Sequence, residues 1–323
     1  MKRAYIKGTG SYTPPKVIKN DFFEAVGSND EWIFKNLGIK ERRIVEGEVT
    51  SDLASKAALI ALEDAGITAE EVNLIIVATS TPDRQAPSTA CFVQEKINAP
   101  HAVAFDISAV CSGGIYGLAI GSQFIQTGMY KNVLVIGADV FSSITDWSRK
   151  DSVFFGDGAG AVLLSATTED KGFIDFKLHA DGTGKYHFNI PAGGCEIPAS
   201  EETIKQGLHY FQMNGKDVSN TATKVLPEVI HEVLADNNLT ANDIDWVIPH
   251  QPSVRILQKV AEEVNIPFEK VMTNMDKYAN TSGGTIPIVL DETYKSGKIK
   301  EGNTLLFAAV GSGWTWGAAL YKV

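Results

Sequence analysis

Three side chains of the sequence stand in settings that suit acyl chemistry: a cysteine, a histidine and an asparagine. Cys111 follows the apolar stretch 102–107 and precedes a run of small residues with helical spacing, 112–126. A cysteine at a helix N-terminus faces free backbone amides and the positive end of the helix dipole, and both favour the thiolate. We therefore expect Cys111 to be a nucleophile with a thiol pKa below its ordinary value. The alternative is a buried structural cysteine.

The histidine and the asparagine lie where the sequence restricts or frees the backbone. His250 stands between Pro249 and Pro252, and prolines fix the direction of the chain. Asn280 precedes the stretch 281–284, whose glycines permit close backbone approach. An imidazole and an amide can both donate a hydrogen bond to one developing oxyanion, and such a donor is worth about 3–4 kcal/mol. Taken singly, His250 is also compatible with a turn residue and Asn280 with a helix cap.

The other cysteines and the glycine-rich segments give weaker signals. We interpret Cys91, in a helical pattern, and Cys195, in a glycine-rich loop, as structural. The stretch 156–160 lacks the Lys-Ser/Thr pair of a phosphate-binding loop. The stretch 310–317 offers backbone amides for an oxyanion hole, or is a plain tight turn. Three widely spaced cysteines without a C-x-x-C pair predict neither a disulfide framework nor a metal site.

The elements that must position these side chains follow from the apolar pattern. The segments 73–78, 132–137 and 304–308 are continuous apolar runs, which predict strands covered on both faces. The segments 51–65 and 219–235 have helical spacing, and each begins with a serine that suits an N-cap. Their alternation indicates an α/β fold.

An internal repeat at an offset of about 170 residues directs attention to equivalent points of two halves. The pairs of similar segments are 68–76 with 240–248, 112–114 with 282–284, and 132–138 with 303–309. The pattern predicts a duplicated fold about a pseudo-twofold axis. Residues 1–165 would carry the cysteine and residues 166–323 the histidine and asparagine, so that strand ends of both halves meet at one cleft. The alternative is the common helix–turn–strand order of any two βα units.

Composition excludes several classes of protein. The chain has 323 residues and a net charge of −10, which argues against general nucleic-acid binding because that needs a basic surface. No apolar run approaches the roughly 20 residues of a membrane span. The N-terminal apolar run stops at Lys7, too short for the core of a signal peptide. We expect a cytoplasmic protein.

Taken together, ordered motifs over nearly the whole chain resemble the β-ketoacyl-acyl-carrier-protein synthase III family of the thiolase superfamily. They include the nucleophile motif DISAVCSGG and the histidine and asparagine motifs PHQ and NTS. The set is GTGSYTPP (8–15), DEWI (30–33), GIKERR (38–43), DISAVCSGG (106–114), FGDGAG (155–160), PHQ (249–251), NTS (280–282) and GWTWG (313–317).

The resemblance implies a thiolase-like fold of α/β/α/β/α layers and a decarboxylating condensation in fatty acid biosynthesis. Cys111 would take an acyl group from a coenzyme A thioester, while His250 and Asn280 would stabilise the enolate that malonyl-acyl-carrier protein forms on losing carbon dioxide. The amides of Cys111 and Ser312 would form the oxyanion hole. The resemblance implies no cofactor besides the coenzyme A thioester, which is a substrate, and a homodimer.

The resemblance also assigns the substrate channel, where this chain departs from the family. Trp32 matches an aromatic residue at the coenzyme A entrance and Arg255 a basic residue near the carrier-protein site. Smaller residues replace the family's bulk at several positions, so we expect a wider channel and longer donors than acetyl coenzyme A. A specialised-metabolite ketosynthase, an acyltransferase and an idle partner subunit remain alternatives, although the intact catalytic set argues against the last. The substrate-binding assignments are Trp32, Ser219, Ser253, Val310, Gly311 and Gly313, and the departures are Asn36 for Arg, Ser253 for Asn, Ser219 and Val310 for Phe, and Ser312 for Gly.

Overall fold

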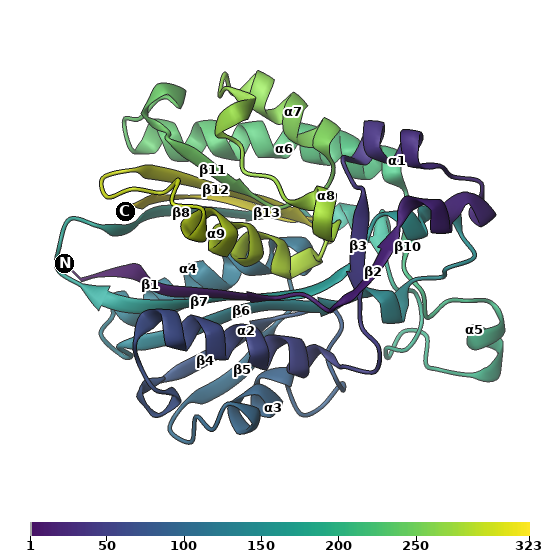
Figure 1. Cartoon of the computed structure of the whole chain (residues 1–323), viewed down its shortest axis with the longest axis horizontal. Helices are drawn as coiled ribbons and strands as arrows, with labels where there is room; N and C mark the ends of the chain where they lie inside the picture. The colour runs from purple at the N-terminus through teal and green to yellow at the C-terminus, as the bar shows by residue number, and fades with distance from the viewer. Residues whose placement is uncertain (1) are drawn as a thin grey trace.

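Two β-sheets with helices between them and on both outer sides make up the protein (Figure 1). The computed structural model describes residues 2–323. The first sheet has the strand order β1-β7-β6-β4-β5 and the second the order β11-β12-β13-β8. The antiparallel pairs β2–β3 and β9–β10 form separate two-stranded sheets. The strands are β1 Arg3–Tyr12, β2 Lys16–Lys19, β3 Glu41–Ile44, β4 Leu74–Ala78, β5 Val103–Ile107, β6 Asn132–Val140, β7 Asp157–Thr167, β8 Gly172–Ala180, β9 Phe188–Asn189, β10 Gln212–Met213, β11 Trp246–Pro249, β12 Thr304–Gly311 and β13 Thr315–Lys322.

The helices form three layers around the two sheets. Helices α2 and α3 cover the outer face of the first sheet, α6 and α7 that of the second, and α4 and α9 lie between the sheets (Figure 1). The predicted order of α/β/α/β/α layers is therefore confirmed. The helices are α1 Asp30–Leu37, α2 Thr50–Ala65, α3 Thr89–Lys96, α4 Gly113–Gln126, α5 Glu201–Lys205, α6 Gly215–Asp236, α7 Val254–Glu263, α8 Met275–Tyr278 and α9 Thr285–Lys295.

The continuous apolar strands are buried on both faces, as their sequences predict. In β12, Leu305 and Phe307 point into the core between the sheets, whereas Leu306 and Ala308 point into the core under α6 and α7. Successive side chains of a strand face opposite ways, so a strand with helices on both sides needs apolar residues at every position. Strand β4 is likewise buried at all its positions.

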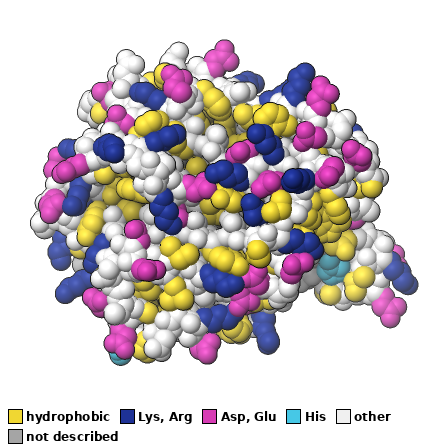
Figure 2. Space-filling view, in the orientation of Figure 1, with side chains coloured by type: hydrophobic (Ala, Val, Ile, Leu, Met, Phe, Trp, Pro, Cys, Tyr) yellow, Lys and Arg dark blue, Asp and Glu magenta, His cyan; other side chains and the backbone are white. Residues whose placement is uncertain are grey.

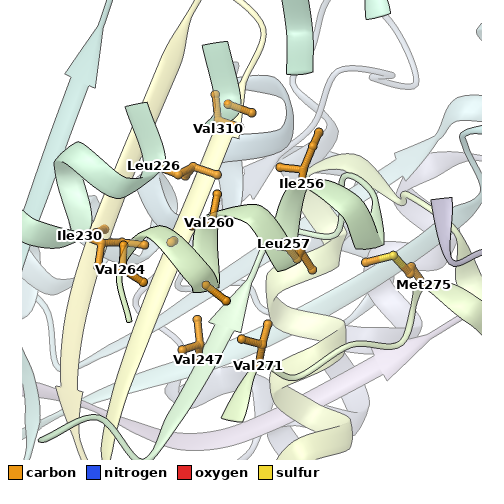
Figure 3. Packing of buried hydrophobic residues seen from close by; sticks show 14 of the residues in the cluster. Leu226, Ile230, Val247, Ile256, Leu257, Val260, Val264, Val271, Met275 and Val310 are labelled. Atoms are coloured by element: carbon orange, nitrogen blue, oxygen red, sulfur yellow. The ribbon is translucent and has the colours of Figure 1, made fainter. Parts of the chain in front are cut away.

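The outer core of the second sheet shows why α7 is held rigidly. Val260 of α7 and Val264, which follows its last residue, pack with Leu226 and Ile230 of α6 and with Val247 of β11 (Figure 3). Helix α7 follows His250 in the chain and forms one wall of the cavity described below. The packing of its apolar stripe therefore fixes the position of the α7 residues that line this cavity.

Both predicted serine N-caps are wrong. Helix α6 begins four residues before Ser219, because the side chain of Asn214 caps it by accepting a hydrogen bond from the Asp217 amide. Helix α2 begins at Thr50, and Asp52 bonds back to the Val49 amide at 2.9 Å. In α6 a short polar side chain takes the capping position, whereas in α2 that position is Val49 and the polar contact comes from Asp52 in the first turn. Ser219 is thereby left inside the helix, where it lines the cavity.

The sequence repeat corresponds to equivalent elements of the two sheets. A short 3-10 turn precedes α4 at Val110–Ser112 and another precedes α9 at Ser282–Gly284. The first sheet uses residues 3–167 and the second 172–322. The division into halves at residues 165 and 166 stays a prediction.

Charges of both signs are interspersed over the face shown in Figure 2. Among residues 2–323, no helix is both long and apolar enough to cross a membrane. A cytoplasmic location stays a prediction.

Candidate active site

A cavity of about 380 Å³ is lined by residues from both halves of the chain. It brings Cys111 together with His250 and Asn280, which are more than 130 residues away in the sequence. The cavity wall also holds the predicted oxyanion-hole residue and most predicted substrate residues. Its lining is Trp32, Asn36, Leu37, Val110, Cys111, Phe154, Phe155, Phe188, Met213, Gly215, Val218, Ser219, Ala222, Thr223, His250, Pro252, Ser253, Arg255, Ile256, Lys259, Asn280, Val310, Gly311, Ser312 and Trp314.

Cys111 lies in the 3-10 turn that leads directly into α4, so its expected place at a helix N-terminus is confirmed. The preceding residue, Val110, has a φ of 46°. A β-branched residue in the left-handed region costs roughly 1–3 kcal/mol and persists only where the surroundings impose it. Here the surroundings are tight: a β-carbon on Gly311 would stand 3.0 Å from the Cys111 amide nitrogen. The strained turn aims the thiol at the cavity.

The expected lowering of the Cys111 pKa is wrong for the resting protein. The residue is partly accessible through the cavity. Nevertheless, burial raises the pKa of its thiol to about 12, and the negative charge of Asp139 acts in the same direction. Hydrogen bonds from Ser282 and Asn280 oppose this rise without cancelling it. The thiol is therefore neutral at neutral pH, and its attack on a thioester needs a proton acceptor.

The orientation of the Asn280 amide is set by its neighbours. Its Oδ1 accepts a hydrogen bond from the Ser282 amide at 2.7 Å. Its backbone forms a short bridge with the first half, donating to the Phe154 carbonyl at 3.1 Å and accepting from the Gly156 amide at 3.0 Å. Because Oδ1 is engaged, the Nδ2 hydrogens are the groups left to point at Cys111 and the cavity.

His250 continues the line of β11, and its amide donates to the Ala308 carbonyl at 2.9 Å. The ring is almost fully buried, with 3% of the residue exposed. Burial lowers its pKa to about 3, so the imidazole is neutral at neutral pH. Its Nδ1 lies 2.7 Å from Thr285 Oγ1. Thr285 does not line the cavity, so the nitrogen turned toward the cavity is Nε2.

A buried carboxylate beneath the site escaped the sequence reasoning. Asp139, at the end of β6, accepts hydrogen bonds from the Ser80 amide at 2.7 Å and the Gly283 amide at 3.1 Å. Burial raises its pKa to about 6. The bond to Gly283 joins the first half to the loop that carries Asn280. An aspartate at the end of an apolar strand was the only available signal.

The turn between β12 and β13 approaches Cys111 closely. Gly311 packs against the turn of Cys111 so tightly that a β-carbon would lie 2.5 Å from the Ala109 carbonyl oxygen. Ser312 lines the cavity beside it, and its hydroxyl donates to the Phe188 carbonyl. The assignment of the Ser312 amide to an oxyanion hole stays a prediction. Gly313 is in the turn, with a φ of 142°, but does not line the cavity.

Beside Trp32 and at the N-terminal end of α7, the cavity is lined by two of the residues that differ from the family, Asn36 and Ser253. Trp32, 42% exposed, has the ammonium of Lys150 6.0 Å above its ring. The side-chain amide of Asn36 donates a hydrogen bond to the Trp32 carbonyl at 2.6 Å, so this side chain is turned back onto its own helix. Ser253 caps α7 by accepting from the Ile256 amide at 3.3 Å. Asn36 and Ser253 therefore bond to their own helices, whereas the departure Ser312 lies in the turn beside Cys111.

Arg255 and Lys259 stand one turn apart on α7 and are both exposed at the cavity wall. Lys259 was not predicted, although its spacing of four residues from Arg255 on a helical pattern puts both on one face. The two side chains give the mouth a basic edge on a protein whose net charge is −10.

The inner wall is aromatic. Phe155 and Phe188 line the cavity, with ring centroids 5.8 Å apart. Phe141 stacks behind Phe155 at 4.4 Å, and Phe211 stacks behind Phe188 at 5.5 Å. This phenylalanine wall, composed of Phe141, Phe155, Phe188 and Phe211, provides an apolar surface next to Asn280.

Comparisons with known proteins agree with this geometry over nearly the full length of the chain. A family model described as 3-oxoacyl-[acyl-carrier-protein (ACP)] synthase III matches residues 105–182, and the model of its C-terminal part matches residues 234–323. Beta-ketoacyl-[acyl-carrier-protein] synthase III of Caldanaerobacter subterraneus is 48% identical over 322 residues, which cover 99% of this chain and 97% of that protein. The protein of the same name from Clostridioides difficile is 46% identical over 323 residues, covering 99% and 98%. The crystal structure of 3-oxoacyl-[acyl-carrier-protein] synthase III from Aquifex aeolicus has a TM-score of 0.92 and 42% identity, covering 99% of this chain and 100% of that one.

Proposed function

The chain belongs to the 3-oxoacyl-[acyl-carrier-protein] synthase III family, and from that premise we propose the reaction that its cavity carries out. It is a condensing enzyme of the acyltransferase class in fatty acid biosynthesis. It transfers an acyl group from coenzyme A to Cys111 and then to the carbon freed when malonyl-acyl-carrier protein loses carbon dioxide. The observation that carries the proposal is the convergence of Cys111, His250 and Asn280 on one cavity.

In the first half-reaction the Cys111 sulfur attacks the thioester carbonyl of acyl coenzyme A. The carbonyl oxygen becomes an oxyanion, which the amides of Cys111 and Ser312 stabilise by hydrogen bonds. The coenzyme A sulfur departs, and the acyl group stays on Cys111 as a thioester. Because the thiol begins neutral, its proton must leave as the new carbon–sulfur bond forms.

In the second half-reaction a malonyl thioester occupies the channel that coenzyme A has left. Its carboxylate departs as carbon dioxide, and the electron pair forms an enolate whose oxygen needs a hydrogen-bond donor. The Nδ2 of Asn280 is aimed by the bond between Oδ1 and the Ser282 amide, so it is ready to donate. The enolate carbon attacks the acyl-Cys111 thioester, which releases a β-ketoacyl product and the cysteine thiolate. Thiol, imidazole, amide and backbone donors suffice for these steps without a bound cofactor.

The acyl group is short and apolar. The phenylalanine wall supports this, because two buried rings back the two rings that line the inner cavity. Ser219 and Val310, which the sequence predicts to widen the channel, line it away from this wall and leave the wall in place. The predicted use of longer donors therefore meets a barrier that packing does not readily move.

The basic edge of Arg255 and Lys259 supports an acidic carrier protein as the second partner. Both side chains are exposed beside the cavity mouth, where a carrier must stand if its prosthetic arm is to reach Cys111. Opposite charges at an interface rim mainly accelerate encounter and fix orientation.

A homodimer is supported by the free edge of the first sheet. Strand β5 is the last strand of that sheet, and Val103 on it is 48% exposed. An apolar edge strand offers unpaired backbone groups to another strand. Pairing of β5 with the β5 of a second copy satisfies them.

Ala104→Pro tests this pairing, because it removes a backbone N–H donor from the free edge of β5. The variant should elute as a monomer in size-exclusion chromatography with light scattering.

The test of the reaction follows both half-reactions on one protein. Intact-protein mass after exposure to a panel of acyl coenzyme A thioesters should increase by one acyl group. Later addition of malonyl-acyl-carrier protein should remove that group, release carbon dioxide and yield a β-ketoacyl carrier. If the protein is acylated but forms no condensation product, the acyltransferase alternative is the correct one. No acylation by any thioester of the panel would refute the proposal.

A further inference from the structure

The proposed reaction leaves one buried carboxylate, that of Asp139, without a task. The residue is fully buried and does not line the cavity. Its Oδ1 accepts three hydrogen bonds from the first half, and its Oδ2 accepts one from the second half. The donors to Oδ1 are the Ser80 amide at 2.7 Å, the Thr81 hydroxyl at 3.1 Å and the Thr79 hydroxyl at 3.2 Å, and the donor to Oδ2 is the Gly283 amide at 3.1 Å. One side chain therefore ties the two halves together beneath the site.

Only an ionised carboxylate serves both backbone donors at this position. A backbone N–H donates and never accepts, whereas a threonine hydroxyl can turn toward another partner. The amides of Ser80 and Gly283 approach different oxygens of Asp139, so both oxygens must accept. A side-chain amide has one such oxygen, and its N–H2 group would face the second donor. Burial raises the pKa of Asp139 to about 6, which leaves the carboxylate mostly ionised at neutral pH.

The turn that Asp139 holds also sets the direction of Asn280. Ser282 has a φ of 51°, and a residue other than glycine in this left-handed region costs roughly 1–3 kcal/mol and persists only where its surroundings impose it. Two successive amides of the turn have different partners. The Ser282 amide donates to Asn280 Oδ1 at 2.7 Å, and the next amide, that of Gly283, donates to Asp139. Loss of the second bond lets the strained turn relax, and the first bond then changes with it.

We propose that Asp139 is a positioning residue for the second half-reaction: its carboxylate fixes the turn at Ser282 and Gly283 and thereby the direction in which the Asn280 amide donates to the enolate. The inference rests on the proposed function, since it assigns the support of the group that promotes decarboxylation. Asp139 does not assist the nucleophile, because its negative charge adds to burial in raising the pKa of the Cys111 thiol.

The variant that tests the proposal is Asp139→Asn, which keeps the shape of the side chain and leaves one acceptor oxygen. Three donors share the Oδ1 position, so the amide oxygen should stay there and the N–H2 group should face the Gly283 amide. Decarboxylation should fall by about 10- to 100-fold, because a displacement of about 1 Å at a reacting group costs up to about that factor. Acylation of Cys111 by acyl coenzyme A should stay within a few-fold of the original rate.

A double variant separates positioning from a general structural effect. Carbon dioxide release from malonyl-acyl-carrier protein is measured in a Cys111→Ala background, where no condensation contributes. If Asp139 acts through Asn280, Asp139→Asn should cause no further loss once Asn280→Ala is present, because the effects of coupled residues do not add. Losses that multiply in the double variant would overturn the proposal.

A matched control is the buried carboxylate of Asp291 on α9. It also joins the two halves, since it accepts from the Thr9 hydroxyl at 2.8 Å and from the Ser11 hydroxyl at 2.6 Å, but it does not line the cavity. Asp291→Asn should decarboxylate at the original rate even if thermal unfolding shows that it is less stable. Equal losses of decarboxylation in Asp291→Asn and Asp139→Asn would mean that any loosening between the halves has this effect, and the proposal would be wrong.

A second variant acts from the other end of the hydrogen bond and decides the matter if Asp139→Asn does not fold. Gly283→glycolic acid, a backbone ester, removes only the N–H that Asp139 accepts and keeps every side chain. It should show the same loss of decarboxylation with acylation retained. An unchanged rate of carbon dioxide release in this variant would overturn the proposal.

NMR spectra of isotope-labelled asparagine give a readout that does not depend on activity. The side-chain amide signals of Asn280, identified as those missing in Asn280→Asp, should shift in Asp139→Asn and stay in place in Asp291→Asn. Signals that do not move in Asp139→Asn would overturn the positioning role. Failure of the original protein to decarboxylate malonyl-acyl-carrier protein would refute the proposed function, while the spectra still decide whether Asp139 directs Asn280.

Discussion

The inner end of the cavity and its mouth are built in different ways. At the inner end, Cys111, His250 and Asn280 come from both halves, and the last two are each held by a hydrogen bond to backbone or to a buried side chain. At the mouth, Trp32, Arg255 and Lys259 sit on surface helices and are exposed. The inner groups have one arrangement available, whereas the outer ones keep their rotamer freedom.

The difference separates chemistry from selection of the partner. Reacting groups lose large factors in rate when they are displaced by about 1 Å, which explains the close glycine packing between the halves. At Gly137 a β-carbon would lie within 3 Å of the Gly283 backbone, so only glycine fits there. Exposed charges act over longer distances and in solvent, so their effects are smaller and depend on salt.

Cys111→Ala should have the largest effect, because it removes the only atom of the inner end that forms a bond with the acyl group. We expect no acyl-enzyme in intact-protein mass spectra and no condensation product. Decarboxylation of malonyl-acyl-carrier protein should persist, since Asn280 remains. Acylation at another residue of the variant would mean that Cys111 is not the nucleophile.

Asn280→Ala should lose decarboxylation by roughly two to three orders of magnitude, as for a missing oxyanion donor, and should still accept an acyl group. The comparison of carbon dioxide release with protein mass separates the two steps. Asn280→Asp serves as control, because it keeps an acceptor for the Ser282 amide but has no Nδ2 hydrogens. If Asn280→Asp decarboxylates at the original rate, Asn280 has only a structural role.

The rate at which iodoacetamide labels Cys111 should depend steeply on pH. The thiolate fraction of a group with a pKa of about 12 rises about tenfold per pH unit below that value. Between pH 7 and pH 9 the labelling rate should therefore rise throughout, without a plateau. A protein in which Cys91 and Cys195 are replaced by serine isolates the signal. A plateau near pH 7 would show that the helix N-terminus outweighs burial.

Arg255→Ala should have the smallest effect and should confirm the contrast with the inner end. It should raise KM for malonyl-acyl-carrier protein several-fold, with kcat and acylation by acyl coenzyme A little changed. The increase should shrink at high salt, where exposed charges are screened. Lys259→Ala is the matched variant one helical turn away and should act in the same direction. A drop in kcat of the size expected for Asn280→Ala would place Arg255 among the reacting groups.

Much of the fold was predictable because it follows from local patterns. Apolar runs and motif spacing are enough to predict the buried strands, the repeat, and Cys111, His250 and Asn280 as the candidate catalytic residues. Helix starts were less predictable, since Ser219 and Asn214 are equally good caps by type and only the path of the chain selects Asn214. Lys259 and the phenylalanine wall needed the folded chain, which gathers their members from separate segments.

The sequence by itself determined the type of chemistry, since the identity and order of Cys111, His250 and Asn280 specify a thiol nucleophile with an imidazole and an amide. Only the tertiary structure decided the protonation of these groups. A helix N-terminus is a local feature and favours the thiolate, whereas desolvation depends on everything packed around the sulfur, and here it outweighs the helix. The loop that carries Asn280 is likewise held by Asp139, whose carboxylate the fold brings to the Gly283 amide from 144 residues away.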